Sequence, residues 1–209
     1  MSTQVKFFRV EVPVEGLRSR KKAKTRMLIE DAALRLFAEQ GYEATTVEQI
    51  AAEVEISTTT FFRYFPTKAD VVLCHQDANM PQLCEIILAY PPGESDLSAV
   101  RQAIIEVWVP NSDPLHSQRA GRAVATSASL RGLYNDMSRN WLEGIAAALA
   151  QRRGLSEPDD GATITARVAL GVFNEAVRAW GHGGYKAPVG TMVENAFAKL
   201  RQLSAEWAK

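Results

Sequence analysis

Apolar residues recur along this chain at the spacing of α-helices, whereas the alternation typical of β-strands is nearly absent. Ile29, Ala33, Leu36 and Phe37 follow one another at steps that place them on one face of a helix. This helix is expected to end at Gly41, because glycine readily takes the left-handed conformation that closes many helices. The pattern predicts an all-α fold whose first helix follows an N-terminal extension, residues 1–16.

Three shorter helices are predicted after that glycine. Each begins at residues whose side chains can cap a helix N-terminus. The expected caps are Thr45 with Glu48, Ser57, and Thr67 with Asp70. Pro66 separates the third helix, Thr58–Tyr64, from the fourth. Two short helices joined by a tight turn are therefore expected to follow the long first helix in the sequence.

The third helix has an unusual set of outward residues. Phe61 and Phe65 are four positions apart and should face inward. Their inward position leaves Thr58, Thr59, Phe62 and Arg63 on the outer face. An exposed phenylalanine beside an arginine is unfavourable on a bare surface. In a DNA major groove, however, methyl groups and aromatic rings can contact thymine methyls, and arginine can bond guanine. The segment is thus interpreted as a DNA-reading helix.

The composition is that of an ordinary soluble globular protein, with 46% hydrophobic and 23% charged residues. Lysine plus arginine equals aspartate plus glutamate at 24 each, so the net charge indicates no class of partner. The distribution of charge is more informative. Six basic residues and no acid lie between residues 16 and 29: Arg18, Arg20, Lys21, Lys22, Lys24 and Arg26. This cluster indicates a phosphate-binding arm, the alternative being a helix start that only meets solvent.

The segment AALRLFAEQGYEATTVEQIAAEVEISTTTFFRYFPTKADVV resembles the N-terminal domain of TetR-family transcriptional repressors. The resemblance rests on the run from Gly41 to Ala51, the start of a helix at Ser57, the aromatic third helix, and the sequence Phe65 to Lys68. It implies a helix-turn-helix DNA-binding domain over residues 17–75. Residues 76–209 would then form a helical domain for effector binding and dimerisation, in which the chain matches the family only in general character.

The resemblance also implies residue roles in DNA binding. Thr46 would contact a phosphate at the start of the second helix, and Tyr64 and Lys68 would grip phosphates near the end of the third. The recognition helix would contribute Ser57, Thr58, Thr59, Thr60, Phe62 and Arg63, and the basic arm Arg20, Lys21, Lys22 and Lys24. Two residues depart from the family pattern. Glu55 stands where glycine is frequent in the turn, and Phe62 stands where many relatives have tyrosine.

The second domain is expected to contain six helices, near residues 81–89, 96–108, 115–126, 128–152, 161–180 and 189–207. The resemblance implies that the last two pack against the same helices of a second subunit. Their apolar stripes permit such a dimer interface. The residues concerned are Val168, Val172, Ala176, Trp180, Phe197, Leu200, Leu203 and Trp207. The alternative is that these stripes only cover the core of their own domain.

A small-molecule cavity is expected between the middle helices, as in other repressors of this type. Its candidate residues are the aromatics Trp108, Tyr134, Trp141 and Phe173, with ordinary core packing as the alternative for each. Three arginines on the same helices either meet an anionic ligand or stay solvated: Arg122, Arg131 and Arg139. The basic arm and the aromatic third helix are also similar to a subgroup that binds acyl-CoA-like molecules.

Catalysis is not expected. The histidines His75, His116 and His182 are scattered, and they form no metal-ligand spacing with Cys74 or Cys84. The cysteines are expected to be reduced core thiols. There is no hydrolase elbow or phosphate loop, no signal-peptide pattern, and no stretch near the roughly 20 apolar residues of a membrane span. A cytoplasmic protein without enzymatic activity, metal or cofactor is the expectation.

These features predict a homodimeric, sequence-specific transcription regulator of TetR type. It would act as a repressor that an unknown small-molecule effector releases from a double-stranded DNA operator. Two alternatives stay open. One is a helical small-molecule-binding or scaffold protein whose DNA-binding helices no longer read DNA, and the other is an activator.

Overall fold

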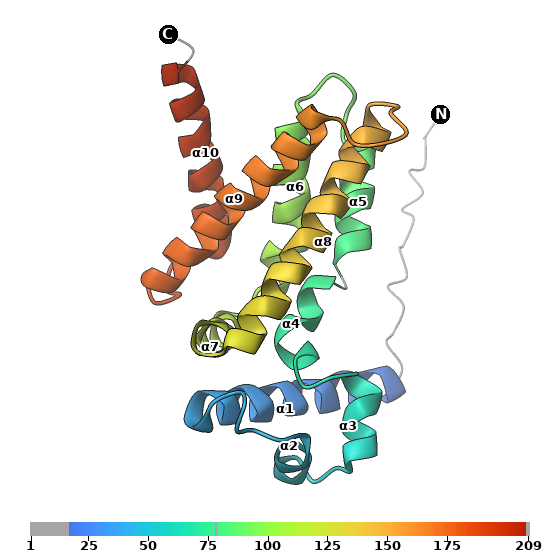
Figure 1. Ribbon diagram of the computed structural model, residues 1–209, viewed down its shortest axis with the longest axis vertical. Helices are drawn as coiled ribbons and strands as arrows, with labels where there is room; N and C mark the ends of the chain where they lie inside the picture. Colours follow the sequence, from blue (N-terminus) through green and yellow to red (C-terminus); the bar gives the residue numbers. More distant parts are fainter. Residues whose placement is uncertain (1–16, 78, 208–209) are drawn as a thin grey trace, which may run out of the picture.

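The computed structural model describes residues 17–77 and 79–207, and these residues form helices without any strand (Figure 1). The expected extension, residues 1–16, lies outside the described part. Helix α1, Leu17–Gln40, ends where Gly41 takes a φ of +91°. Ile29, Ala33 and Phe37 are buried along one face of α1. The long first helix and its end are therefore confirmed.

Helix α2, Val47–Glu53, begins one residue later than expected, because its cap is Thr46 and not Thr45. The Thr46 hydroxyl accepts from the Gln49 backbone N–H at 3.2 Å, and the Gln49 side chain accepts from the Thr46 N–H at 2.9 Å. Thr45 is buried instead, and its hydroxyl donates to the Gly41 carbonyl at 2.8 Å. The expected capping box of Thr45 with Glu48 is therefore wrong by one position.

Helix α3, Thr58–Tyr64, begins at the expected cap, with the Ser57 hydroxyl accepting from the Thr60 N–H at 3.1 Å. The preceding turn places Glu55 at a φ of +55°. This left-handed conformation costs a non-glycine residue about 1–2 kcal/mol, which explains why glycine is frequent at such a turn. Thr67 and Asp70 bond each other ahead of α4, Asp70–Asp77, as predicted.

Six further α-helices follow, within a few residues of the predicted ranges. They are α5, Met80–Ala89; α6, Asp96–Val107; α7, Pro114–Thr126; α8, Ala128–Arg152; α9, Asp160–His182; and α10, Val189–Trp207. A short 3₁₀ helix, Val109–Asn111, was not predicted. It follows Trp108 and lets the chain turn from α6 toward α7.

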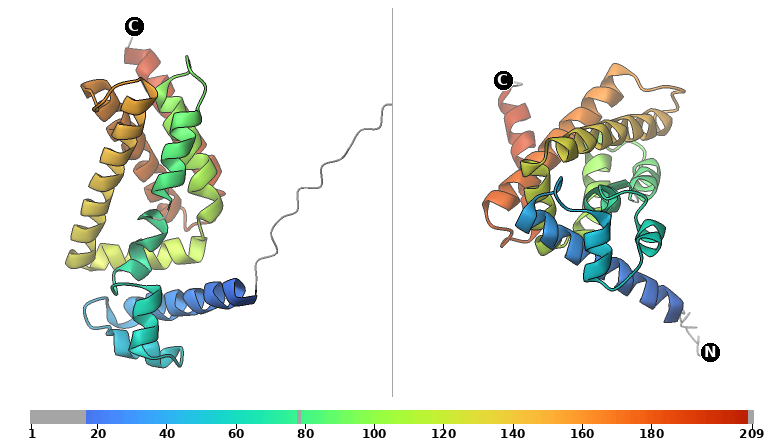
Figure 2. Two further views of the ribbon diagram at one scale, coloured as in Figure 1. Left: turned by 90° about the vertical axis from the view of Figure 1, so that its right-hand side faces the viewer. Right: turned by 60° about the horizontal axis from the view of Figure 1, so that its bottom comes forward.

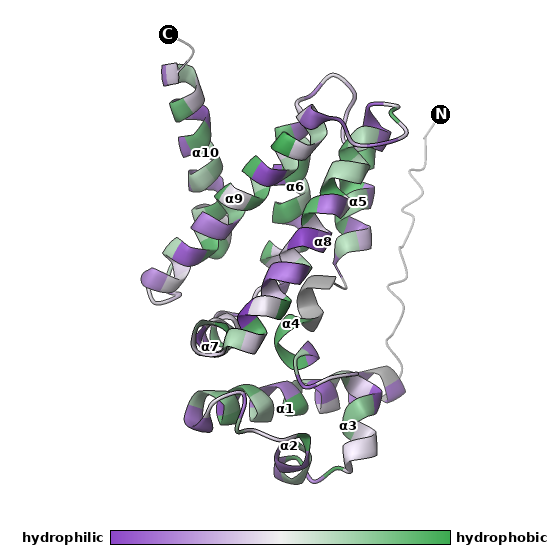
Figure 3. Cartoon of the chain, viewed as in Figure 1, coloured by the Kyte–Doolittle hydropathy of each residue, from purple (hydrophilic) through white to green (hydrophobic). Residues whose placement is uncertain are grey.

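The helices form a lower and an upper layer. Helices α1 to α3 lie at the bottom of Figure 1, and α4 leads upward to the remaining helices. Helix α7 lies directly above α1, as both views agree (Figure 2), and the two helices contact each other. Figure 3 shows α6 as mostly hydrophobic, whereas α1 carries hydrophilic residues at both ends. The buried apolar residues of both layers belong to one continuous hydrophobic core, and the end of α10 stands away from it.

No helix within the described ranges combines the length and the hydropathy that a membrane crossing requires. The thiol of Cys84 is half-buried near Met80, and this burial raises its pKa. The side chain of Cys74 lies outside the described residues.

Candidate nucleic-acid interface

The outer face of α3 is exposed as the sequence predicted. Phe61 and Phe65 are fully buried, with ring centroids 5.8 Å apart, and they turn the opposite side of the helix outward. Thr59 and Arg63 are exposed, and Phe62 keeps 50% of its surface accessible. Half of a large apolar side chain is thus left in solvent on a seven-residue helix. A single exposed apolar side chain is ordinary on a protein surface, so the significance of Phe62 depends on the charged residues that surround it.

The hydroxyls at the start of α3 have different surroundings. Ser57 caps the helix, and its hydroxyl also lies 2.9 Å from the hydroxyl of Thr60. Thr58 and Thr60 are half-buried, whereas Thr59 is exposed. Thr59 is therefore the threonine of this run that best presents its side chain outward.

Arg26 fixes the orientation of α3 against α1. Its guanidinium donates to the Tyr64 carbonyl at 3.2 Å and to the Glu30 carboxylate at 3.1 Å. The same group lies 4.4 Å from the centroid of the Phe65 ring. A guanidinium over an aromatic face is attracted by the ring quadrupole. Although Arg26 belongs to the basic cluster, it holds the end of the recognition helix in place.

Four cationic side chains converge on a hollow between the start of α1 and the end of α3. The hollow is open to solvent and has a volume of about 510 Å³. It is lined by Arg18, Lys21, Lys22, Thr25, Arg63 and Tyr64. Arg20 and Lys24 are exposed but do not line it. The basic arm and the recognition helix therefore form one positively charged surface, as an interface with phosphates requires.

This convergence was not predicted, although the spacing of the residues carries a signal for it. Residues 18, 21, 22 and 25 are spaced as one face of a helix, so a continuous α1 brings them to the same side. Arg18 and Thr25 lie on this face but were not among the predicted DNA-binding residues. What the sequence did not show is that this face of α1 is the one beside Arg63.

Lys68 differs from the expectation that it grips phosphate. Its ammonium donates to the carbonyls of Tyr42 and Thr45, both at 2.6 Å, and lies 4.2 Å from the Tyr42 ring centroid. Desolvation lowers its pKa. These contacts use two of its three N–H donors. Lys68 therefore holds the α1–α2 loop, and only its third donor is available for a phosphate. The loop leads to Thr46, which is exposed at the start of α2.

A cluster of hydrogen bonds joins the lower layer to the corner between α7 and α8. The Glu43 carboxylate accepts from the hydroxyls of Ser127 at 2.5 Å and Ser129 at 2.8 Å. Ser127 is fully buried and also caps α8 by accepting from the Leu130 N–H. The hydrogen bonds from both serines lower the pKa of Glu43. We call these three residues the Glu43 clamp. An ion pair of Arg119 with Asp31 joins α7 to α1 nearby.

The four predicted cavity aromatics do lie together between α6, α8 and α9. They line a small cavity of about 20 Å³, with room for about one water molecule. The full lining is Trp108, Tyr134, Met137, Ser138, Trp141, Leu170, Phe173 and Asn174. The three arginines that were considered for an anionic ligand are not part of it. Arg131 bonds the carbonyl of Ala125, Arg139 pairs with Asp136, and Arg122 is exposed.

The predicted dimer stripes divide into an inner and an outer set. Ala176, Trp180 and Phe197 are buried in the chain's own core, and the Trp180 indole donates to the Ala187 carbonyl at 2.9 Å. We therefore remove these three from the expected interface. The outer set consists of half-buried and exposed residues. They are Val168, Val172 and Leu200, with Leu203 at 50% and Trp207 at 92% exposure.

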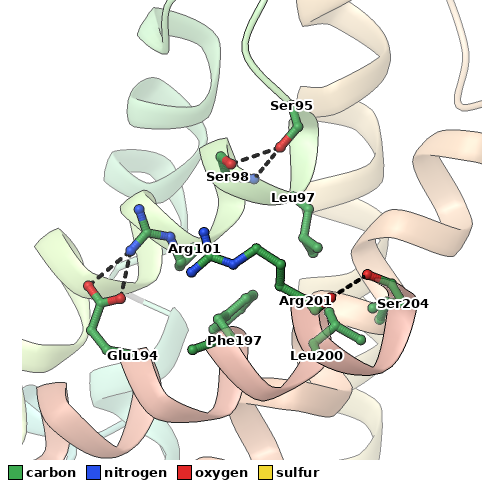
Figure 4. A pocket seen from close by; sticks show the side chains of 11 residues that line it. Ser95, Leu97, Ser98, Arg101, Glu194, Phe197, Leu200, Arg201 and Ser204 are labelled. Atoms are coloured by element: carbon green, nitrogen blue, oxygen red, sulfur yellow. Dashed lines mark hydrogen bonds and ion pairs between the residues drawn. The ribbon is translucent and has the colours of Figure 1, made fainter. Parts of the chain in front are cut away.

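A groove of about 520 Å³ lies between α6 and α10, with Val168 of α9 in its wall (Figure 4). Val168, Phe197 and Leu200 contribute apolar surface to it. Arg101 pairs with Glu194 at 2.7 Å across it, and Figure 4 shows Arg201 extending over Phe197 toward Arg101. The outer stripe thus continues into an open, partly apolar groove.

No cluster of metal-ligating side chains occurs within residues 17–77 and 79–207, as far as their side chains are described. His182 lies 3.2 Å from Arg178 at the end of α9. The side chain of His75 is outside the described part.

Comparison with known proteins identifies two matching segments. A family model described as "Bacterial regulatory proteins, tetR family" matches residues 29–73. A second, described as "MftR C-terminal domain", matches residues 94–204, which is more than half of the 209 residues. The HTH-type transcriptional regulator TcmR of Streptomyces glaucescens is 31% identical, and the match spans 93% of this chain and 91% of TcmR. The matched family and this relative are regulators of transcription, not enzymes.

Two solved structures share the fold. SmeT, the repressor of a Stenotrophomonas maltophilia efflux pump, matches in its triclosan complex with a TM-score of 0.53 at 20% identity, over 84% of this chain and 91% of SmeT. FadR of Bacillus subtilis in complex with stearoyl-CoA matches with a TM-score of 0.53 at 20% identity, over 81% of this chain and 94% of FadR. At this identity the likeness concerns the fold alone.

The Glu43 clamp predicts a specific dependence of stability on pH. Its hydrogen bonds hold the folded-state pKa of Glu43 below the ordinary value of 4.5. The clamp therefore stabilises the fold above that pH, and this contribution is lost as the pH falls through the folded-state pKa. Glu43→Gln keeps an oxygen that accepts from the serines but does not titrate. Urea denaturation should show the wild type losing more stability than Glu43→Gln between about pH 5 and pH 3.

Glu206→Gln, in the exposed last turn of α10, serves as the control for this measurement. Equal pH dependence of the wild type and Glu43→Gln would show that the clamp is not formed in solution.

Proposed function

This chain belongs to the TetR family of bacterial regulatory proteins, and from this premise we propose that it is a homodimeric repressor which a small-molecule effector releases from its DNA operator. A DNA-binding regulator acts where the chromosome lies, so the proposal places the protein in the bacterial cytoplasm. The observation that carries it is the common surface of α3 and the start of α1. Arg18, Lys21, Lys22 and Arg63 meet there beside an exposed Phe62.

The proposal assigns base reading and phosphate binding to different parts of this surface. Phe62 and Thr59 contact base edges through apolar groups, and Arg63 bonds guanine in the major groove. Lys21 and Lys22 hold the phosphates that flank the groove, because they line the hollow that opens beside Arg63. The remaining proposed contacts lie at the margins of this surface. They are Arg20, Lys24, Thr46, Ser57, Thr58, Thr60, Tyr64 and the third donor of Lys68.

The proposed dimer forms through the outer stripes of α9 and α10. Trp207 leaves 92% of its surface in solvent, and Leu203 and Ile164 leave 50% and 59%. Large apolar side chains in such number on one helix pair favour an interface. Dimerisation also serves the DNA contact, because two recognition helices can then enter successive major grooves about 34–36 Å apart.

Effector release is proposed to act through α8. Ser127, the cap of this helix, belongs to the Glu43 clamp, and Tyr134 and Trp141 line the cavity further along the same helix. The cavity has room for about one water molecule, so an organic ligand must displace α8 or α9 to enter. Such a displacement moves the clamp and hence the loop that leads to α2. By linkage, DNA must then weaken effector binding by the same factor.

Two alternatives lead to different observations. A protein whose DNA-binding helices no longer read DNA has no need to keep Phe62 exposed beside four converging cations, so these residues favour DNA binding. An activator and a repressor share the same contacts, and a reporter assay with the protein's own promoter separates them.

Binding to the DNA upstream of the protein's own gene tests the proposal. Lys21→Ala should weaken binding to all duplexes and reduce the slope of log K against log salt by about one, because one phosphate contact is lost. Arg63→Ala should instead reduce the preference for the operator over unrelated DNA, at a cost of about 1–3 kcal/mol. Fluorescence anisotropy at several salt concentrations measures both effects.

Lys186→Ala, in the exposed loop between α9 and α10, is the matched control and should bind like the wild type. A contrary outcome for Arg63→Ala is a reduced slope of log K against log salt while the variant still prefers the operator over unrelated DNA as the wild type does. That result would exclude the proposed base contact of Arg63. A wild type without any salt-sensitive, selective complex would exclude the proposed function.

The dimer is tested by placing a charge on the outer stripe. Trp207→Asp should shift the protein from dimer to monomer, because an aspartate would then have to be desolvated at the interface. Sedimentation velocity measures the change. Leu155→Asp, at a position 42% exposed in the α8–α9 loop, should leave the dimer intact. A monomeric wild type, or an unchanged dimer in Trp207→Asp, would contradict the proposed interface.

A further inference from the structure

The indole of Trp141 carries a buried hydrogen-bond donor without a partner. Trp141 is 4% exposed, and its Nε1–H has no acceptor within hydrogen-bond distance among the described residues. Leaving such a donor unsatisfied costs about 1–3 kcal/mol. Trp180, another buried tryptophan, differs because its indole bonds the carbonyl of Ala187. An orphan donor in a native interior calls for an explanation, and the cavity that Trp141 lines provides one.

The cavity wall is aromatic and uncharged. Trp108 and Phe173 meet edge to face, with centroids 4.7 Å apart and an interplanar angle of 82°. Tyr134 closes another side, and desolvation raises the pKa of its phenol. The polar groups in the lining come from Tyr134, Ser138, Trp141 and Asn174, and none of the lining residues is Lys, Arg, His, Asp or Glu. Rings in this arrangement offer faces and edges to another ring.

From this wall we propose that the effector is a neutral, planar aromatic molecule with a carbonyl or ether oxygen that accepts the Trp141 Nε1–H. The proposal rests on the proposed function and specifies the ligand of its cavity. An acyl-CoA-like ligand is disfavoured, because its phosphates need cationic partners and this lining has none.

The size of the cavity fits a ligand-free state. About 20 Å³ holds roughly one water. The Trp141 Nε1 itself is shielded from contact with water, so in this proposal its N–H gains an acceptor when a ligand oxygen enters. The ligand ring must part α8 from α9 and stack among Trp108, Tyr134 and Phe173. Parting these helices is the same movement that acts on the Glu43 clamp.

A matched pair of probes tests the assignment, namely 9-fluorenone and fluorene. The two molecules are planar, neutral and nearly equal in shape, and only fluorenone carries an acceptor oxygen. Equilibrium dialysis gives the dissociation constant of each for the wild type and for Trp141→Phe. The ratio of the fluorene constant to the fluorenone constant should fall by about fivefold in Trp141→Phe, as loss of one hydrogen bond implies. Using the ratio cancels the change in ring size.

Trp180→Phe is the control and should keep the wild-type ratio, because the Trp180 N–H bonds the protein itself. A second measurement avoids variants that do not fold. In the wild type, fluorenone should move one indole N–H resonance downfield, and fluorene should not. An unchanged ratio in Trp141→Phe, or indole resonances that respond alike to both probes, would overturn the proposal.

Gel shifts with the upstream DNA, made on the same protein samples, distinguish a failure of the proposed ligand class from a failure of the proposed DNA-binding function. A selective DNA complex without binding of either probe would overturn the ligand class alone. Probe binding without a DNA complex would overturn the proposed function but leave the ligand site standing.

Discussion

The burial of Phe61 and Phe65 on the inner side of α3 is the constraint on which the DNA-facing surface depends. Full burial of each ring contributes about 1.5–3 kcal/mol, which exceeds the cost of leaving half of Phe62 in water. Since α3 has only seven residues, fixing two rings inside determines what points out. Arg26 adds a second restraint by bonding the carbonyl of Tyr64 and covering the Phe65 ring. The outer residues of α3 therefore keep one orientation relative to α1.

The long helix α8 connects the two ends of the proposed mechanism. Its cap, Ser127, bonds Glu43 in the lower layer, and its middle forms one wall of the aromatic cavity. A small cavity and an intact clamp occur together in this structure. Together they correspond to the state that we propose for DNA binding, in which no ligand separates α8 from α9. The buried Trp141 N–H then has a place in the same account, because its missing hydrogen bond favours a ligand with an acceptor oxygen over the ligand-free cavity.

Much of the fold could be predicted from local patterns. The spacing of apolar residues and the capping residues predicted the ends of the helices to within a few residues. Ser57 was correctly identified as the cap of α3. The cap of α2 was misplaced, because Thr45 and Thr46 are both good caps and only tertiary contacts decide between them. Thr45 is held inside by the Gly41 carbonyl, which leaves Thr46 at the helix start.

The contacts between distant segments could not be predicted in the same way. Apolar spacing alone did not distinguish the inner residues Ala176 and Trp180 from the outer residues Val168 and Val172, since one helix carries both. Lys68 was expected at phosphates, but the carbonyls that it bonds lie 26 and 23 residues away in sequence. The four cavity aromatics were each identified from the sequence. That they leave a space of only about 20 Å³ between them depends on how three helices pack.

Lysine modification footprinting with mass spectrometry tests most directly whether α3 and the start of α1 form one DNA surface. The account predicts that the upstream DNA slows acetylation of Lys21 and Lys22 but leaves the exposed Lys186 and Lys199 unchanged. Equal acetylation of Lys21 and Lys22 with and without bound DNA would contradict it.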